Sequence, residues 1–146
     1  MKIKNLLFIT LLLCLTNVYS QIKTSKIIAK NQERFITTTI AYPIAGIYHY
    51  VGEKEPITQL NANGTGIYQN EDLIKKNITW GIESSQTGIP IFKEGFDSSS
   101  YSLWYKTDDK EDSEWVYAQF SIHFNKKKMF ISGERVKEYA EEVKKS

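Results

Sequence analysis

Apolar and polar residues alternate along much of this chain with a period of two, the pattern typical of β-strands. The clearest example spans residues 114–124, where every second side chain is apolar and is expected to face a core: Val116, Ala118, Phe120, Ile122 and Phe124. Further runs rich in β-branched and aromatic residues, separated by Gly, Asn and Asp, predict strands near 35–42, 46–51, 57–61, 65–69, 77–83, 89–93, 100–106 and 128–133. The pattern therefore predicts eight or nine strands.

The connections between these strands are short, so neighbouring strands are expected to be antiparallel. A sheet of this many strands with one apolar face hides that face most simply by closing on itself. We therefore predict an all-β fold, an antiparallel up-and-down barrel of about eight strands, with a β-sandwich as the alternative. The best-defined connection is Asn63-Gly64, which predicts a two-residue type I′ hairpin turn because both residues accept positive φ.

The two flanks of this β-rich region are less regular. Residues 21–34 are polar and weakly periodic, which is compatible with a short helix or an irregular lead-in. Residues 129–133 follow strand spacing, whereas Val136, Tyr139 and Val143 recur at helix spacing, which favours a strand that runs into a short C-terminal helix. The predicted organisation is a leader (1–20), a lead-in (21–34) and a single barrel domain (35–146).

The first twenty residues have the features of a secretory signal peptide. Lys2 and Lys4 give a positive start, residues 6–15 form an apolar run, and a polar end follows. The run is about half the roughly twenty apolar residues that a membrane-spanning helix needs. We expect cleavage between Ser20 and Gln21 and a secreted or periplasmic protein.

A lipid anchor on Cys14 is the alternative interpretation of the leader. It is disfavoured because Leu13 stands where such sites have a small residue, and because cleavage there would fall inside the apolar run. Cys14 is the one cysteine of the chain, so cleavage after Ser20 leaves none. Disulfides, thiol catalysis and cysteine-bound metals are then not expected.

The charge balance bears on the class of partner. Cleavage of the leader removes Lys2 and Lys4 from the 19 basic residues of the chain and removes none of its 17 acidic residues. The mature chain therefore has equal numbers of basic and acidic residues. A nucleic-acid binder needs a surplus of Lys and Arg to displace counterions, so this class is not expected. The hydrophobic fraction of 41% argues against a disordered chain.

Four short segments carry a resemblance to a known family: Gly46-Ile47-Tyr48, the hairpin at residues 63–68, Trp80-Gly81-Ile82-Glu83, and Arg135. Over residues 46–135 the chain resembles a lipocalin-like domain of the calycin type, the small barrels of secreted bacterial proteins. Lipocalins proper have Gly-x-Trp in the first strand and an Arg that packs across that ring, whereas this chain has Tyr48 in place of the Trp. The resemblance implies a barrel that closes over a small apolar ligand or one adapted to protein contacts.

Few residues suggest catalysis or metal binding. His49, predicted to point inward, and His123, predicted to point outward, are the histidines that could act as bases, and no nucleophile motif accompanies them. The acidic residues between 108 and 114 lack the spacing of a calcium loop and are interpreted as a solvated hairpin tip, like the lysines at 126–128. We therefore assign no catalytic residue, metal ligand or cofactor and favour a protein that is not an enzyme.

The inward positions of the predicted barrel are mostly apolar but include a few polar tips. Tyr101, Tyr105 and His49 each bring a polar group that needs a partner, which a ligand or trapped water could supply. Alternatively, these groups bond to one another or to the backbone in a solid barrel. We expect a small apolar or amphipathic ligand in the interior, in contact with His49, Trp80, Tyr101, Tyr105 and Phe120.

Three aromatic residues fall on the outward face of the predicted strands: Trp104, Trp115 and Tyr117. An exposed aromatic cluster would mark contact with a protein or a glycan, which makes a secreted interaction module the alternative function. The same rings could instead be covered by Tyr139 and Val143 of the predicted C-terminal helix.

Overall fold

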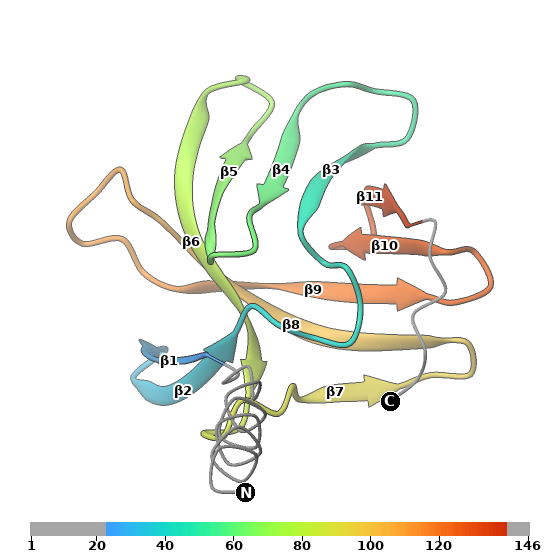
Figure 1. The fold of residues 1–146 in the computed structure, drawn as a ribbon. Coiled ribbons are helices and arrows are strands. Elements are labelled where there is room, and N and C mark those ends of the chain that lie inside the picture. The colour runs from blue at the N-terminus through green and yellow to red at the C-terminus, as the bar shows by residue number, and fades with distance from the viewer. Residues whose placement is uncertain (1–22, 140–146) are drawn as a thin grey trace, which may run out of the picture.

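The computed structural model describes residues 23–139, and within this range every regular element is a β-strand (Figure 1). The strands are β1 (Thr24–Ala29), β2 (Gln32–Thr37), β3 (Gly46–Tyr50), β4 (Ile57–Leu60), β5 (Thr65–Gln69), β6 (Lys75–Ser84), β7 (Phe92–Glu94), β8 (Ser98–Thr107), β9 (Val116–His123), β10 (Lys128–Ile131) and β11 (Arg135–Glu138). The predicted leader and its cleavage site lie outside the described residues.

Eight of these strands form a closed antiparallel barrel. Each of β3, β4, β5, β6, β8, β9, β10 and β11 pairs with the next in this order, and β11 pairs back with β3 through Arg135 opposite Tyr50. Closure also requires β6, which pairs with β5 along one edge and with β8 along the other, so that no barrel strand keeps a free edge along its whole length. The predicted all-β, up-and-down barrel is confirmed.

The remaining strands extend the sheet beyond the barrel. The ten-residue strands β6 and β8 continue past their barrel partners, and the β1–β2 hairpin pairs with the end of β6, with Phe35 opposite Ser84. β7 pairs with the start of β8, with Phe92 opposite Tyr101. Figure 1 shows the β1–β2 hairpin and β7 on the same side of the barrel, below β8 in this view.

The hairpin corrects the interpretation of residues 21–34, since residues 24–37 form two paired strands rather than a helix or an irregular lead-in. Its apolar content is low because it buries only one face, on which Ile27, Ala29 and Ile36 pack against Trp104. The helix spacing that begins at Val136 was also misleading, because Val136 lies in β11. Residues 140–146, where the predicted helix would continue, lie outside the described residues.

The turn at Asn63-Gly64 differs in type from the prediction. The Gly64 N–H donates to the Asn61 carbonyl (3.0 Å) and the Asn61 N–H to the Thr65 carbonyl (2.8 Å), so the loop has three residues, 62–64. Gly64 has φ +86°, whereas Asn63 is not among the residues with positive φ and instead accepts the Thr65 N–H on its side chain (3.1 Å). The result is a three-residue hairpin loop in which Gly64 is the left-handed residue, and not a type I′ turn.

Candidate functional site

The middle of the barrel is filled by its own side chains. The largest buried ones, each less than 2% exposed, include Trp80, Tyr48, Phe120, Leu60, Ile78, Leu103 and Ile122. The polar tips are satisfied locally: the Trp80 indole N–H lies within hydrogen-bonding distance of the Thr65 carbonyl (2.9 Å) and the Asn61 carbonyl (3.1 Å), and the Tyr48 hydroxyl donates to the Ile44 carbonyl (2.6 Å). An eight-stranded barrel is narrow enough for such residues to fill it. We call Trp80, Tyr48 and Phe120 the plug, because they block the middle of the barrel and divide its interior into two ends.

The position of each predicted ligand residue follows from the plug. Trp80 and Phe120 lie within it. Tyr101 and Tyr105 face inward from β8 on either side of Leu103, four residues or about 13 Å apart along the strand. They therefore line two different hollows, Tyr101 at one end of the barrel and Tyr105 at the other.

His49 points away from the interior, so its predicted orientation is wrong. Successive side chains of a strand face opposite sides, and Tyr48 of β3 is completely buried in the core beside Phe120. His49 is half-buried on the other face, with Nδ1 2.8 Å from the Tyr50 carbonyl oxygen. The two aromatic residues at 48 and 50, on one face of β3, were the signal in the sequence that gives the correct orientation.

The hollow at the Tyr101 end is an apolar groove with a volume of about 430 Å³. Its walls come from the β2–β3 and β6–β7 connections, β7, β8 and the residue after β9, and its apolar lining includes Ile40, Tyr42, Ile89, Phe92, Tyr101 and Phe124. The rings of Phe92 and Tyr101 are 5.3 Å apart, and those of Tyr42 and Phe124 are 5.5 Å apart. Thr39, Ser99 and Glu94 add a few polar groups to an otherwise apolar surface.

The pKa values of two tyrosine hydroxyls that line this groove are raised by burial. Burial, and to a smaller degree the neighbouring Tyr42, raises the pKa of Tyr101 to about 12. Burial also raises the pKa of Tyr42 above its ordinary value. Both hydroxyls are therefore protonated at neutral pH and can donate hydrogen bonds to a guest in the groove.

The hollow at the Tyr105 end is a smaller cavity of about 90 Å³ with a mixed lining, in which Tyr50, Tyr68, Tyr105 and Arg135 bring polar groups. Arg135 is 6% exposed, and its Nη1 donates to the Ile57 carbonyl (3.0 Å) and the Thr58 hydroxyl (2.6 Å). Its Nη2 donates to the Gln69 carbonyl (2.6 Å).

The guanidinium of Arg135 also packs on two rings. Its Cζ lies 4.8 Å from the centre of the Tyr68 ring and 5.4 Å from that of Tyr50. The ring at Tyr48, where the resemblance would have placed this contact, lies further inside the barrel and packs against Phe120 instead. Sequence reasoning used Arg135 for the resemblance but did not include it in the site.

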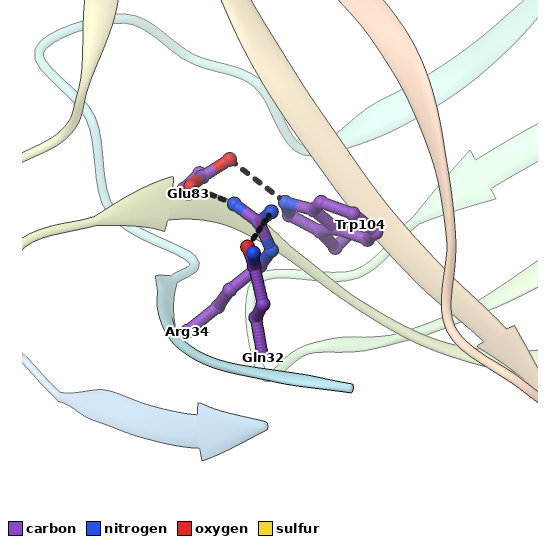
Figure 2. A network of polar contacts seen from close by, with 4 residues as sticks. All are labelled: Gln32, Arg34, Glu83 and Trp104. Carbon is purple, nitrogen blue, oxygen red and sulfur yellow. Dashed lines mark hydrogen bonds and ion pairs between the residues drawn. The ribbon is translucent and has the colours of Figure 1, made fainter. Parts of the chain in front are cut away.

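The outward aromatics are mostly covered, and by a different element than predicted. Trp104 is 3% exposed because the β1–β2 hairpin lies over it. Figure 2 shows how the ring is held: its Nε1 donates to Glu83 Oε2 (3.0 Å), and Glu83 Oε1 is 2.7 Å from Arg34 Nη1. The Arg34 guanidinium lies 4.9 Å from the Trp104 ring centre and donates to Gln32 (2.9 Å).

The other two outward aromatics lie beside Trp104. Trp115 is partly buried against the cluster under the hairpin. Tyr117 is 55% exposed, with its ring centre 5.7 Å from that of Trp104 and the Lys30 ammonium 5.0 Å above it. Of the predicted cluster, Tyr117 is thus the ring that keeps a large exposed surface.

Candidate metal ligands do not gather in the described part of the chain. Between residues 23 and 139, no three His, Cys, Asp or Glu side chains converge in a way that could hold a metal ion. His123 packs edge-on against Phe130, with ring centres 5.0 Å apart. In the acidic loop, Asp109 Oδ2 lies 3.5 Å from Lys76 Nζ. The pKa of the Asp109 carboxyl is lowered mainly by a hydrogen bond from Thr107 and, to a smaller degree, by the Lys76 charge.

The fold and its two hollows define a closed, eight-stranded antiparallel β-barrel with a blocked middle. No protein-family model matches the chain, and no similar protein was found among curated proteins or solved structures. Within residues 23–139 there is no helix of the length and apolar character needed to cross a membrane.

Proposed function

We propose that this protein is a non-enzymatic, lipocalin-like binding protein that holds a small apolar or amphipathic molecule in the groove at the Tyr101 end of its barrel. The observation that carries the proposal is the groove itself. Its volume of about 430 Å³ lies within the range of roughly 300–1,000 Å³ that small-molecule pockets occupy. Its lining, mostly apolar with a few polar groups, is also typical of such pockets.

The plug sets the depth of binding. Because Trp80, Tyr48 and Phe120 fill the middle of the barrel, a guest sits at the barrel mouth and does not extend through the interior. An amphipathic guest would place its apolar part against Phe92 and Phe124. Its polar part would meet the protonated hydroxyls of Tyr42 and Tyr101.

The test is a titration of the protein with a fluorescent hydrophobic probe and a series of fatty acids, in which saturable binding is expected. Ile89 is 65% exposed at the groove, so Ile89→Glu places a charge in the lining without disturbing the core. Losing this apolar contact and desolvating a carboxylate costs about 1–3 kcal/mol, so probe affinity should fall by roughly 10- to 100-fold.

Val51→Glu is the matched control, because Val51 is 74% exposed and lies outside the groove. Its probe affinity should equal that of the unmodified protein. Absence of saturable binding by any probe, or equal losses in the two variants, would refute the proposal.

An interaction module that binds a protein or glycan through Trp104, Trp115 and Tyr117 has less support. Trp104 lies under the β1–β2 hairpin and Trp115 is partly buried, so the three rings do not form a continuous exposed surface. Export of the chain with cleavage between Ser20 and Gln21 is part of the proposal and stays a prediction, as the described residues begin at Lys23.

A further inference from the structure

The cavity at the Tyr105 end contains a buried positive charge with an unusual set of partners. Arg135 is 6% exposed, and its hydrogen bonds go to neutral oxygens, the carbonyls of Ile57 and Gln69 and the hydroxyl of Thr58. The ion pairs between residues 23 and 139 join other side chains, and none includes Arg135. A buried charge without an opposite charge is costly, so an anion that reached this cavity would be stabilised there.

The guanidinium retains donors for such an anion. It has five N–H groups, and the three hydrogen bonds above use both hydrogens of Nη1 and one of Nη2. Among the described residues, no acceptor lies within hydrogen-bonding distance of Nε–H or of the second hydrogen of Nη2. Two N–H groups of one guanidinium are the arrangement that accepts a planar oxyanion through two hydrogen bonds.

The cavity that these donors adjoin is small, and its lining mixes polar groups with apolar side chains such as Leu60 and Leu103. Its lining adds the residues Tyr50, Tyr68, Tyr105 and Ser132 to Arg135. Burial raises the pKa of Tyr105, Tyr68 acts in the same direction, and the Arg135 charge opposes both, so the Tyr105 hydroxyl stays a donor at neutral pH. The volume of about 90 Å³ exceeds the roughly 10–15 Å³ that one water needs, but it is far smaller than the groove.

We propose that this cavity is a binding site for a small carboxylate-type oxyanion, of the size of formate or acetate, held by Arg135 with the Tyr105 hydroxyl as a further donor. The site is separate from the groove of the proposed function, because the plug of Trp80, Tyr48 and Phe120 lies between them. Access is through the rim, where Ser132 and Glu134 are exposed. The buried Arg135 charge and the tyrosine hydroxyls favour a small anion over a purely apolar guest.

Two other occupants compete with the anion. Water alone can satisfy the remaining donors, since the cavity has room for several molecules. Glu134 lines the same cavity and carries the opposite charge, so its carboxylate could turn inward and act as the counterion. The experiment therefore has to separate a bound anion from water and from Glu134.

The experiment titrates the purified protein into ¹³C-formate at constant ionic strength and follows the line width of the formate NMR signal. Saturable broadening that unlabelled acetate reverses is expected. Arg135→Gln should abolish the broadening, and Tyr105→Phe, which keeps the ring and removes the hydroxyl, should weaken formate binding by at least about 10-fold, the loss of one hydrogen bond to a charged group. Arg34→Gln is the control, because Arg34 lies outside the barrel beside Glu83 and should leave formate binding unchanged.

If Arg135→Gln does not fold, the proposal is tested with Tyr105→Phe and Ser132→Ala, each of which should weaken formate binding. Absence of saturable broadening, or equal effects of Arg135→Gln and Arg34→Gln, would overturn the proposal in favour of water. Broadening that appears only in Glu134→Gln would overturn it in favour of Glu134 as the counterion. Ile89→Glu should leave formate binding unchanged, so failure of this site and failure of the groove are distinguishable.

Discussion

Replacing Gly64 by valine is expected to destabilise the barrel through the β4–β5 turn. Gly64 has φ +86°, a left-handed conformation that costs a residue with a Cβ roughly 1–2 kcal/mol, and a β-branched side chain resists it further. An added Cβ would also lie 3.2 Å from Thr38 Cγ2 and 3.5 Å from the Trp80 carbonyl oxygen. The first contact is tighter than ordinary van der Waals contact, so we expect a total loss of about 2–3 kcal/mol.

Gly52→Val separates the two contributions. Gly52 has φ +82°, almost the same conformation, and an added Cβ there would meet no atom within 4 Å. Its cost should therefore be the conformational one alone, about 1–2 kcal/mol. The difference between the two variants measures the contact with Thr38 and the Trp80 carbonyl.

Urea denaturation followed by tryptophan fluorescence gives the free energy of unfolding of each variant, and thermal denaturation provides a second measurement. For a domain of this size, about 3–6 °C per kcal/mol is expected, so Gly64→Val should lower the melting temperature by roughly 6–18 °C. An unfolding midpoint of Gly64→Val equal to that of the unmodified protein would show that Gly64 is not in the left-handed conformation. Equal losses in the two variants would remove the packing contribution.

Two further predictions concern the pH dependence of stability and the contacts under the hairpin. The pKa of Tyr101 is raised from 10.0 to about 12 in the folded state, so its contribution is fully present below pH 10 and is lost as the pH rises toward 12. Unfolding midpoints measured between pH 9 and 12 should therefore fall less steeply for Tyr101→Phe, and parallel curves would contradict this. Glu83→Ala should cost about 2 kcal/mol, since Glu83 holds both Arg34 and the Trp104 indole, and Glu83→Gln should cost less because its amide oxygen can still accept one bond. Urea denaturation measures both, and equal losses would contradict this reasoning, because they would mean that the one acceptor kept by the glutamine contributes nothing and that the whole contribution depends on the carboxylate.

The groove and the cavity could be predicted only in part from the sequence. Tyr101 and Tyr105 were correctly placed on the inward face of β8 by the period-two pattern. That pattern does not report the distance of a residue from each barrel end, so it could not show that the two tyrosines line separate hollows. Tyr42 and Ile89, which complete the groove, lie in connections without regular alternation, and their position depends on how these segments cross the barrel end.

Local patterns in the sequence determined the strand periodicity of this protein. Phe120 and Ile122 of β9 meet the core as the alternation predicts, whereas Val116 at the start of the strand is 44% exposed. The repetition of that pattern along the chain favours an antiparallel barrel and leaves a β-sandwich as the alternative. The Asn63-Gly64 pair likewise marked a hairpin, because only a few residues accept positive φ.

Tertiary packing decided which of the locally acceptable alternatives formed. The three-residue loop at Gly64 places the Asn61 and Thr65 carbonyls on the Trp80 indole N–H, a contact between β6 and a turn at least 15 residues earlier in the chain. The β1–β2 hairpin forms on the exposed end of β6 and covers Trp104, so a polar segment with weak periodicity becomes two strands. In each case the deciding contact joins residues far apart in the chain, and a pattern of near neighbours does not contain that information.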